Sequence, residues 1–499
     1  MTRFWIPTLS AVFLVSSGCA VGRKYQAPAP VAPPAPAFRE LRGNDQWKMA
    51  TPSDELLKGK WWEVFGDEQL NRLEELVNID NQNVKQAEAN FRQARAVLAG
   101  DRANYYPIIG SSPAITQSDA GKNAGRGLGG TSQSFSLPVN ISWEPDLWGR
   151  VRLAVENATA NAQVSAADLE NLRLSTQAQL ATDYFALAGD DMQQAILQDT
   201  IQAYQRNLEL TINRFNGGVA SRSDVTLAQT QLAGAQAQST DLRIARAQDE
   251  HAIAVLTGQP PENIEIATVT IKGPPPAIPV ALPSTLLERR PDIAAGERTV
   301  AAANANIGIA DTAYYPTLTL SATPGLLTTS LAHLVTWGAR VWSAGPTLSQ
   351  TLFDFGRRNA QVQGTQAAFD ATVAGYRETV LAAFQEVEDD LASLRYLSEE
   401  AGQQAEAVTA AEESLTLEMA RYIAGTDSYL NVITTQTIEL SDRQAAVSIL
   451  QRRMLAAVDL VKALGGGWDS STLPTSDQMR SASLANPNTT VNIAQPIAK

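Results

Sequence analysis

The residues from Ser132 to Trp143 read SQSFSLPVNISW, and apolar and polar side chains alternate along them. Because successive side chains of a strand point to opposite sides, this alternation gives one apolar and one polar face. The apolar face holds Phe135, Leu137, Val139, Ile141 and Trp143. The pattern is typical of a strand in a transmembrane β-barrel, although a half-buried soluble sheet would show it equally well. Trp143, with Trp148 after it, suits an aromatic belt at a membrane surface.

Three further segments are expected to be strands. Residues 316–324 and 340–353 alternate in part, whereas residues 108–117 alternate poorly. The chain therefore presents two pairs of strands, and a very long helical segment follows each pair.

Two helical hairpins of unusual length are predicted, at about residues 150–257 and 357–464. The first arm of each would be roughly 100 Å long at 1.5 Å per residue. From Val373 to Tyr422, apolar residues recur at spacings of three and four, with polar interruptions at Ser398 and Glu412. One extra four-residue step indicates a coiled-coil seam with a stutter. The helices alone would also fit a long soluble bundle.

The N-terminus has the features of an export signal over residues 1–18. Arg3 supplies a positive start, and the mostly apolar run behind it is too short to span a bilayer. Small residues then precede Cys19, the only cysteine, which predicts cleavage before Cys19 and its acylation as a lipoprotein. An ordinary signal peptide with a chance cysteine is the alternative. Ala20, in place of an aspartate, favours transfer to the outer membrane.

The strands are the only candidates for a membrane span in the mature chain, because no later segment has about 18 uninterrupted apolar residues. Their position between long helices, in an exported chain, favours a membrane barrel over a soluble sheet. Four strands would leave open edges in lipid, and closed barrels need about eight strands or more. Two or three copies of the chain would close the barrel with eight or twelve strands.

The chain repeats itself at a nearly constant offset. Tyr105-Tyr106-Pro107 recurs 209 positions later, and the following pairs are 207 positions apart: Gly149 and Gly356, Arg150 and Arg357, Arg214 and Arg421, Gly218 and Gly425, Ser221 and Ser428. Such an offset predicts two structural repeats, at 61–272 and 284–467, with a Pro-rich linker at 273–283. An extended segment, 19–60, precedes them. A polar tail, 468–499, is expected to be disordered.

Composition excludes several classes of protein. A formal net charge of −13 makes nucleic-acid binding a poor candidate, since phosphates require clustered Lys and Arg. One cysteine and two histidines allow no disulfide and no ordinary Cys/His metal site. The Gly-rich segment 119–130 lacks the GK[ST] sequence of a phosphate-binding loop. We therefore expect no enzyme activity, no catalytic residues, no metal and no cofactor other than the lipid on Cys19.

Several motifs together resemble the outer-membrane factor family of TolC-like channels, most closely its lipoprotein branch that serves resistance–nodulation–division efflux pumps. They are the start at Cys19, the Trp61-Trp62 motif with Phe65-Gly66-Asp67, and the segment LPSTLLERRPDI from Leu282 to Ile293. Locally, Ser284 is expected to cap a short helix, Pro291 to end it and Asp292 to cap the next one. The likeness covers the chain up to about Trp468.

The resemblance implies a mostly α-helical fold with a membrane β-barrel. Three copies would form one 12-stranded barrel, continued by a helical tunnel into the periplasm. It further implies an outer-membrane exit channel that passively conducts drugs or other small molecules from a periplasmic adaptor protein and an inner-membrane pump. The alternatives are a duct for type I protein secretion and a periplasmic coiled-coil lipoprotein without a pore.

The two Gly-containing turns are expected to form the periplasmic tips. They comprise Arg214, Gly218 and Ser221 in the first repeat, and Arg421, Gly425 and Ser428 in the second. A glycine there can take the positive φ that reverses the chain. By resemblance, the tips dock onto the adaptor protein. A plain turn between helices is the alternative.

The resemblance also places a constriction at the second tip, where Asp427 of each copy would ring the pore. Such a ring favours cations, and crowded carboxylates raise one another's pKa. Tyr422 is expected to tie neighbouring helices through its hydroxyl, and Arg421 to pair with a carboxylate. Ala220 occupies the matching place in the first repeat. Alternatively, Asp427 only caps the returning helix.

Overall fold

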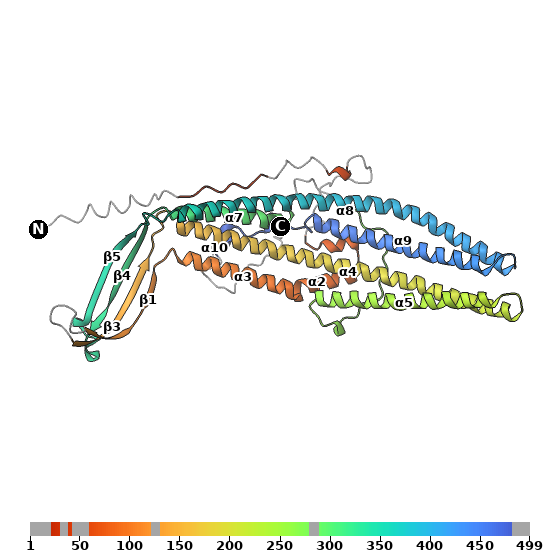
Figure 1. The fold of residues 1–499 in the computed structure, drawn as a ribbon, viewed down its shortest axis with the longest axis horizontal. Coiled ribbons are helices and arrows are strands. Elements are labelled where there is room, and N and C mark those ends of the chain that lie inside the picture. The colour runs from red at the N-terminus through yellow and green to blue at the C-terminus, as the bar shows by residue number, and fades with distance from the viewer. Residues whose placement is uncertain (1–20, 30–37, 42–58, 121–129, 279–288, 482–499) are drawn as a thin grey trace.

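The computed structural model describes residues 21–29, 38–41, 59–120, 130–278 and 289–481. The chain is strongly elongated, with a β-sheet at one end and the turns of two helical hairpins at the other (Figure 1). Cys19, the leader, most of the Gly-rich segment 119–130 and residues 482–499 lie outside the described residues. None of the described helices combines the length and apolar composition that crossing a membrane requires.

Two hairpins form the body of the molecule. Their long arms are α4 (Arg150–Asn216) and α8 (Arg357–Ile423), each of 67 residues. Their returning arms are α5 (Arg222–Leu256) and α9 (Tyr429–Ala463), each of 35 residues. The predicted hairpins at 150–257 and 357–464 therefore agree with the structure to within one residue.

Shorter helices flank the hairpins. They are the 3₁₀ helix η3 (Trp61–Phe65), α2 (Glu68–Asp80), α3 (Gln82–Ala103) and α7 (Pro291–Thr312). Side-chain caps begin two of them: Asp67 accepts from the backbone N–H groups of Gln69 and Leu70, and Asn81 caps α3 in the same way. Short 3₁₀ turns, η1 (Arg39–Leu41), η4 (Pro261–Asn263), η6 (Leu331–His333) and η7 (Trp337–Ala339), occupy connecting segments.

The expected cap at Asp292 is wrong, because Arg290 occupies the N-cap position of α7 and Asp292 is the second residue of the helix. A helix does end before Pro291, as expected, since Arg289 is helical and Arg290 is not. Pro291 is also the first residue of α7, which suits its missing N–H. Asp292 pairs with the buried Arg290 guanidinium at 2.7 Å. Arg290 also donates to Glu386 at 2.6 Å and to the carbonyl of Ala463 at 3.1 Å, so it fastens the start of α7 to α8 and α9.

The sheet is antiparallel and contains β1 (Ile108–Ser111), β2 (Ala114–Ala120), β3 (Gly130–Trp143), β4 (Thr317–Thr328) and β5 (Arg340–Ser349). β1 and β2 both pair with one side of β3, and β4 and β5 follow on its other side. The strand predicted at 108–117 is thus interrupted, at Ser112 and Pro113, because proline has no N–H for the ladder. The strand predicted at 316–324 extends to Thr328, and the one predicted at 340–353 ends at Ser349.

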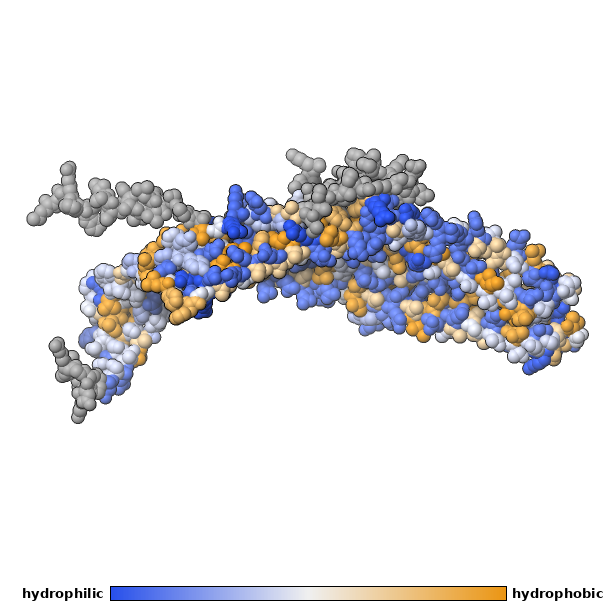
Figure 2. All heavy atoms as spheres, turned by 45° about the horizontal axis from the view of Figure 1, so that its top comes forward, coloured by the Kyte–Doolittle hydropathy of each residue, from blue (hydrophilic) through white to orange (hydrophobic). Residues whose placement is uncertain are grey.

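The pairing register sorts the side chains as the alternation predicted. Ile141 of β3 lies opposite Ile109 of β1 and Ala322 of β4, and Ala322 lies opposite Ala344 of β5. Directly opposed residues point to the same side, so these apolar residues share one face. Polar and small residues at the intervening positions, such as Ser142, Ser321 and Gly345, share the other. Apolar and polar side chains both appear on the visible surface of the sheet (Figure 2).

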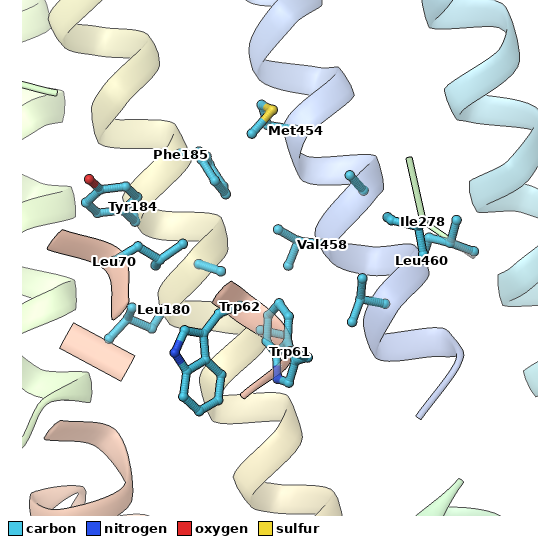
Figure 3. Close-up of a cluster of buried hydrophobic side chains, with 14 of the residues drawn as sticks. Trp61, Trp62, Leu70, Leu180, Tyr184, Phe185, Ile278, Met454, Val458 and Leu460 are labelled. Carbon is cyan, nitrogen blue, oxygen red and sulfur yellow. The ribbon is translucent and has the colours of Figure 1, made fainter. Parts of the chain in front are cut away.

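The main core lies midway along the helices, where side chains from η3, α2, α4 and α9 meet (Figure 3). Trp61 and Trp62 are almost fully buried there. Trp61 donates from Nε1 to Gln177 at 3.2 Å, and Tyr184 donates its hydroxyl proton to Asp67 at 2.8 Å. Ile278, in the described part of the Pro-rich linker, also packs into this core, so that part of the linker is anchored.

Two further expectations need correction. The buried stripe of α8 includes Leu397 and Ala411, and the predicted seam residues Ser398 and Glu412 are exposed. Burying these polar groups without partners would cost more than burying their apolar neighbours. The tail predicted to be disordered is folded as far as residue 481, in η8 (Ser470–Thr472) and α10 (Ser476–Ser481). Met479, which is buried, packs with apolar residues of α3 and α4 and anchors this segment.

Candidate functional site

Both Gly-containing turns lie at the end of the molecule opposite the sheet (Figure 1). Gly218 and Gly425 have φ values of 74° and 76°, a left-handed conformation that other residues adopt only with strain. In each turn a backbone N–H reaches back to an arginine carbonyl: Val219 to Arg214 at 2.8 Å and Thr426 to Arg421 at 3.0 Å. These bonds satisfy carbonyls that the helix end would leave free.

The two returning helices begin differently. In the first, the Ser221 hydroxyl accepts from the Asp224 N–H and the Asp224 carboxylate accepts from the Ser221 N–H, which is a capping box. In the second, the Ser428 side chain makes no such bond. The Asp427 carboxylate instead accepts from the Ser428 N–H at 2.7 Å and from the Asn431 amide at 2.6 Å.

These bonds order the turn, but they differ from the predicted helix cap, because Ser428 occupies the N-cap position and Asp427 accepts from the Ser428 N–H and from a side-chain amide. Together with Arg421, whose guanidinium lies 3.7 Å away, they lower the pKa of Asp427, with the Ser428 N–H as the largest contribution. Within one chain, the pKa of Asp427 is therefore lowered, whereas a ring of carboxylates is expected to raise it. Arg421 also pairs with Glu418 at 2.8 Å, so its predicted pairing with a carboxylate is confirmed.

Tyr422 contributes its ring to the tip. Its side chain is buried, and its ring centroid lies 5.2 Å from that of Tyr429. Its hydroxyl is buried and has no hydrogen-bond partner among the described residues, so the expected tie through that hydroxyl is absent within the chain. Apolar packing joins the tips, since Ala228 of the first hairpin belongs to the same buried cluster as Tyr422, and Arg214 of the first hairpin adds a second contact.

Arg214 reaches across to the second hairpin. Its guanidinium carbon lies 4.6 Å from the centre of the Tyr422 ring, and Nη1 donates to the Ile423 carbonyl at 3.1 Å. A cation above an aromatic face is attracted by the ring electrons. The sequence predicts Arg214 at a tip but contains no signal for this contact, because no local pattern specifies which ring a surface arginine meets.

Acidic residues away from the tips were also missed. A groove of about 630 Å³ beside α8 and α9 is lined by Asp389, Asp390 and Asp459, with Arg452 at its side. Burial, reinforced by Asp459, raises the pKa of Asp390 to about 7. In α2, burial raises the pKa of Glu74 well above its usual value, and neither carboxylate oxygen has a partner among the described residues. Within the described residues, no group of three His, Cys, Asp or Glu side chains is arranged to hold a metal ion.

Comparisons with known proteins agree with this architecture. The family model described as "Outer membrane efflux protein" matches twice, over residues 75–259 and 282–466, which correspond to the two repeats. The antibiotic efflux pump outer membrane protein ArpC of Pseudomonas putida is 30% identical over 472 residues, covering 93% of this chain and 96% of ArpC. The pyoverdine export outer membrane protein OpmQ of Pseudomonas aeruginosa is 30% identical, covering 88% of this chain and 94% of OpmQ.

Solved structures show the same fold. The outer-membrane channel OprN matches with a TM-score of 0.84 and 27% identity, over 90% of this chain and all of the OprN chain. The open state of the MtrE outer membrane channel of Neisseria gonorrhoeae matches with a TM-score of 0.78 and 25% identity, over 91% of this chain and 99% of MtrE. The similarity therefore extends from the strands to the helical tips.

Proposed function

Since the chain belongs to the outer membrane efflux protein family and is the outer-membrane exit channel of a tripartite efflux pump, we propose that it works as a homotrimer. In the periplasm, the trimer is joined to an adaptor protein and, through it, to an inner-membrane resistance–nodulation–division pump. It conducts its cargo passively, with no catalytic step and no cofactor.

The β-sheet is the main support for a homotrimer. One face is apolar, the other is polar, and the β1–β2 and β5 edges have no strand partner among the described residues. A sheet edge in lipid leaves backbone N–H and C=O groups without partners, at a cost of several kcal/mol each. β1 and β2 act as one interrupted strand, so each copy contributes four strands. Three copies supply the twelve strands of a barrel with its polar face toward the pore.

The cargo is proposed to be small organic molecules. The relatives are named for the efflux of antibiotics and toluene and for the export of pyoverdine. Those names favour small-molecule efflux over type I protein secretion. A pore lined by the serine, threonine and glycine positions of the sheet would pass such molecules without a selective binding site.

The tips are proposed to dock onto the adaptor, and the second tip to close the channel. Gly218 and Gly425 keep the turns narrow, and the nearby Ser221 and Ser428 start the returning helices. Three copies of Asp427 would ring the pore, with Arg421 3.7 Å from each carboxylate and the Tyr422 ring packed against Tyr429 beside the turn. At the other end of the chain, Cys19 is proposed to carry the N-palmitoyl and S-diacylglycerol groups that anchor the protein to the outer membrane.

Isolation of the assembled pump tests this proposal. An affinity tag on the chain, after cross-linking in intact cells, should recover one adaptor protein and one resistance–nodulation–division pump. Gly425→Trp should reduce that recovery, because the bulky residue disturbs the tip, while the heat-modifiable oligomer in the outer membrane remains. Recovery of an ATP-driven secretion transporter instead would support protein secretion. Recovery of no partner by an intact oligomer would contradict the proposal.

A further inference from the structure

A pocket of about 610 Å³ lies where the helices meet the sheet. α7 and α8, which pack side by side there (Figure 1), supply most of its wall, and the start of β4, the end of β5 and Arg150 of α4 complete it. We call it the junction pocket. Small-molecule sites usually measure about 300–1,000 Å³, so its size suits such a ligand. Its lining includes Asn306, Ile309, Ala313, Thr317, Gln361 and Ala368.

The junction pocket opens on one side of α7, and residues 21–25 lie on the other side. The Tyr25 hydroxyl donates to the Glu297 carboxylate, and the Asn304 amide donates to a backbone carbonyl of the same N-terminal segment at 3.2 Å. At 3.6 residues per turn, Asn306 lies roughly half a turn around the helix axis from both Glu297 and Asn304. The pocket and the N-terminal segment therefore face opposite sides of α7.

The position of the N-terminal segment indicates which side faces the pore. The Val21 N–H donates to the Trp148 carbonyl at 3.2 Å, at the junction of helices and sheet. Cys19 precedes Val21 by two residues, a reach of about 7 Å. With the proposed acyl chains on Cys19, this segment lies on the lipid side of the barrel, because the acyl chains must enter the bilayer. The junction pocket, on the opposite side of α7, then faces the pore.

The sheet gives the same direction independently. Thr317 of β4 lies opposite Ser349 of β5, and both residues line the junction pocket. Ser321 lies opposite Gly345 four residues farther along the same two strands. Residues an even number of positions apart share one face of a strand, so Thr317 and Ser349 belong to the polar face. That face is the one proposed to line the pore.

The lining of the junction pocket is mixed in polarity and almost without net charge. Ile309 and several alanines supply methyl groups, and the exposed Asn306 and Gln361 supply carboxamides that bond to none of the described residues. Arg150 is already paired with Glu144, through two hydrogen bonds of 2.9 and 2.8 Å. Among the described residues that line the pocket, none is Asp or Glu. The pocket therefore suits an uncharged molecule with an apolar body and a hydrogen-bonding group.

Repeat 1 does not reproduce this lining. Helices α3 and α7 are 209 positions apart, and α4 and α8 are 207 apart. With these offsets, the following positions are equivalent: Glu144 and Thr351, Asp101 and Ala310, Asn161 and Ala368. Each repeat 1 residue is larger, and two of them are carboxylates. The uncharged lining is thus particular to repeat 2.

We propose that the junction pocket is a weak binding site for uncharged amphipathic organic molecules on their way from the helical tunnel to the barrel. The proposal rests on the proposed homotrimer and small-molecule cargo, and it names the class of cargo. The apolar body of the ligand packs on Ile309 and the alanine methyl groups, while its polar group bonds Asn306 and Gln361. The site lies below the sheet-lined part of the pore. Binding is weak, because a conducted molecule must also leave.

Photolabelling of the full-length oligomer in lipid nanodiscs tests the site. 4-(Hydroxymethyl)benzophenone is uncharged and amphipathic, and 4-carboxybenzophenone resembles it but carries a negative charge. The alcohol should label peptides from residues 303–313 and 361–368 saturably, as located by mass spectrometry. The carboxylate should label them about tenfold less, because its charge would leave water without a free cationic partner.

Three variants separate the pocket from the rest of the pore. Ala368→Phe should fill the pocket and remove most of the saturable labelling. Thr299→Phe is the matched control, because Thr299 is exposed on the same side of α7 as Asn306 but about 10 Å farther along the helix, and its labelling should equal that of the wild type. Asn306→Leu keeps the size of the side chain and should weaken labelling several-fold, as expected for one lost hydrogen bond. It decides the question if Ala368→Phe forms no heat-modifiable oligomer.

Labelling that does not saturate, that spreads evenly along the pore, or that persists in both Ala368→Phe and Asn306→Leu would overturn the binding site. Equal labelling by the carboxylate would overturn the uncharged class of ligand. Either result in an oligomer that conducts current would leave the exit-channel function standing. Absence of both oligomer and current would count against the homotrimer as well.

Discussion

We predict that Gly258→Ala destabilises the chain far more than Gly218→Ala, although both glycines have a φ of 74°. An alanine in the left-handed conformation costs about 1–2 kcal/mol at either position. At Gly218 nothing lies within 4 Å of the added Cβ, so that cost is all we expect. At Gly258 the added Cβ would lie 2.3 Å from the backbone oxygen of Asp80, which must move.

The displacement at Asp80 would spread to the neighbouring cap. Asn81 accepts from two N–H groups at the start of α3 and donates to the Leu256 carbonyl at 2.7 Å. Losing the cap costs about 1 kcal/mol, and overpacking costs about 1–3 kcal/mol. Gly258→Ala should therefore cost about 3–6 kcal/mol in total. Gly465, whose added Cβ would meet the Arg289 carbonyl at 2.1 Å, should behave in the same way.

Thermal unfolding of the purified variants, followed by circular dichroism at 222 nm, measures this difference. We expect the melting temperature to fall several times farther for Gly258→Ala and Gly465→Ala than for Gly218→Ala. Equal decreases for all three variants would show that φ strain alone matters. They would refute the close approach of the helix ends to Asp80 and Arg289.

Three further predictions concern charge and anchoring. Burial raises the pKa of Glu74, so the protonated side chain favours folding at low pH, and this contribution to stability is lost as pH rises through the folded-state pKa. The free energy of unfolding of Glu74→Gln should therefore increase relative to that of the wild type between pH 5 and pH 8. Parallel pH profiles of the two proteins in urea unfolding would contradict this. If the Asp427 carboxylate gates the pore, Asp427→Ala and Asp427→Asn should both raise the channel conductance in planar bilayers. Unchanged conductance with a lower melting temperature would show that Asp427 only stabilises the turn. Labelled palmitate should enter the wild type and not Cys19→Ser, and equal labelling would remove Cys19 as the acylation site.

Most of the helical fold could be predicted from the constant offset between the two repeats. Constant separation of pairs such as Gly149 and Gly356 predicted both hairpins to within one residue, because chain reversals depend on local residues. Alternation from Phe135 to Trp143 predicted the apolar face of β3 for the same local reason. The break at Pro113 could also have been read from the missing N–H of proline.

Contacts between distant segments were not foreseen. Arg214 over Tyr422 joins residues 208 positions apart, and no local pattern specifies which ring a surface arginine meets. The order of residues 470–481 depends on Met479 finding a site between α3 and α4, which composition does not reveal. At Asp427 the sequence allows either a helix cap or a gate. Within one chain, the Asp427 carboxylate bonds the Ser428 N–H and the Asn431 amide, whereas Ser428 occupies the N-cap position of the returning helix. The gate depends on neighbouring copies.

Conductance of the purified, heat-modifiable oligomer in planar lipid bilayers tests the exit-channel function most directly. We predict discrete current steps that favour cations, with larger steps when Asp427 is replaced by alanine. A folded oligomer with an intact β-sheet signal that carries no current, in either the wild type or Asp427→Ala, would contradict it.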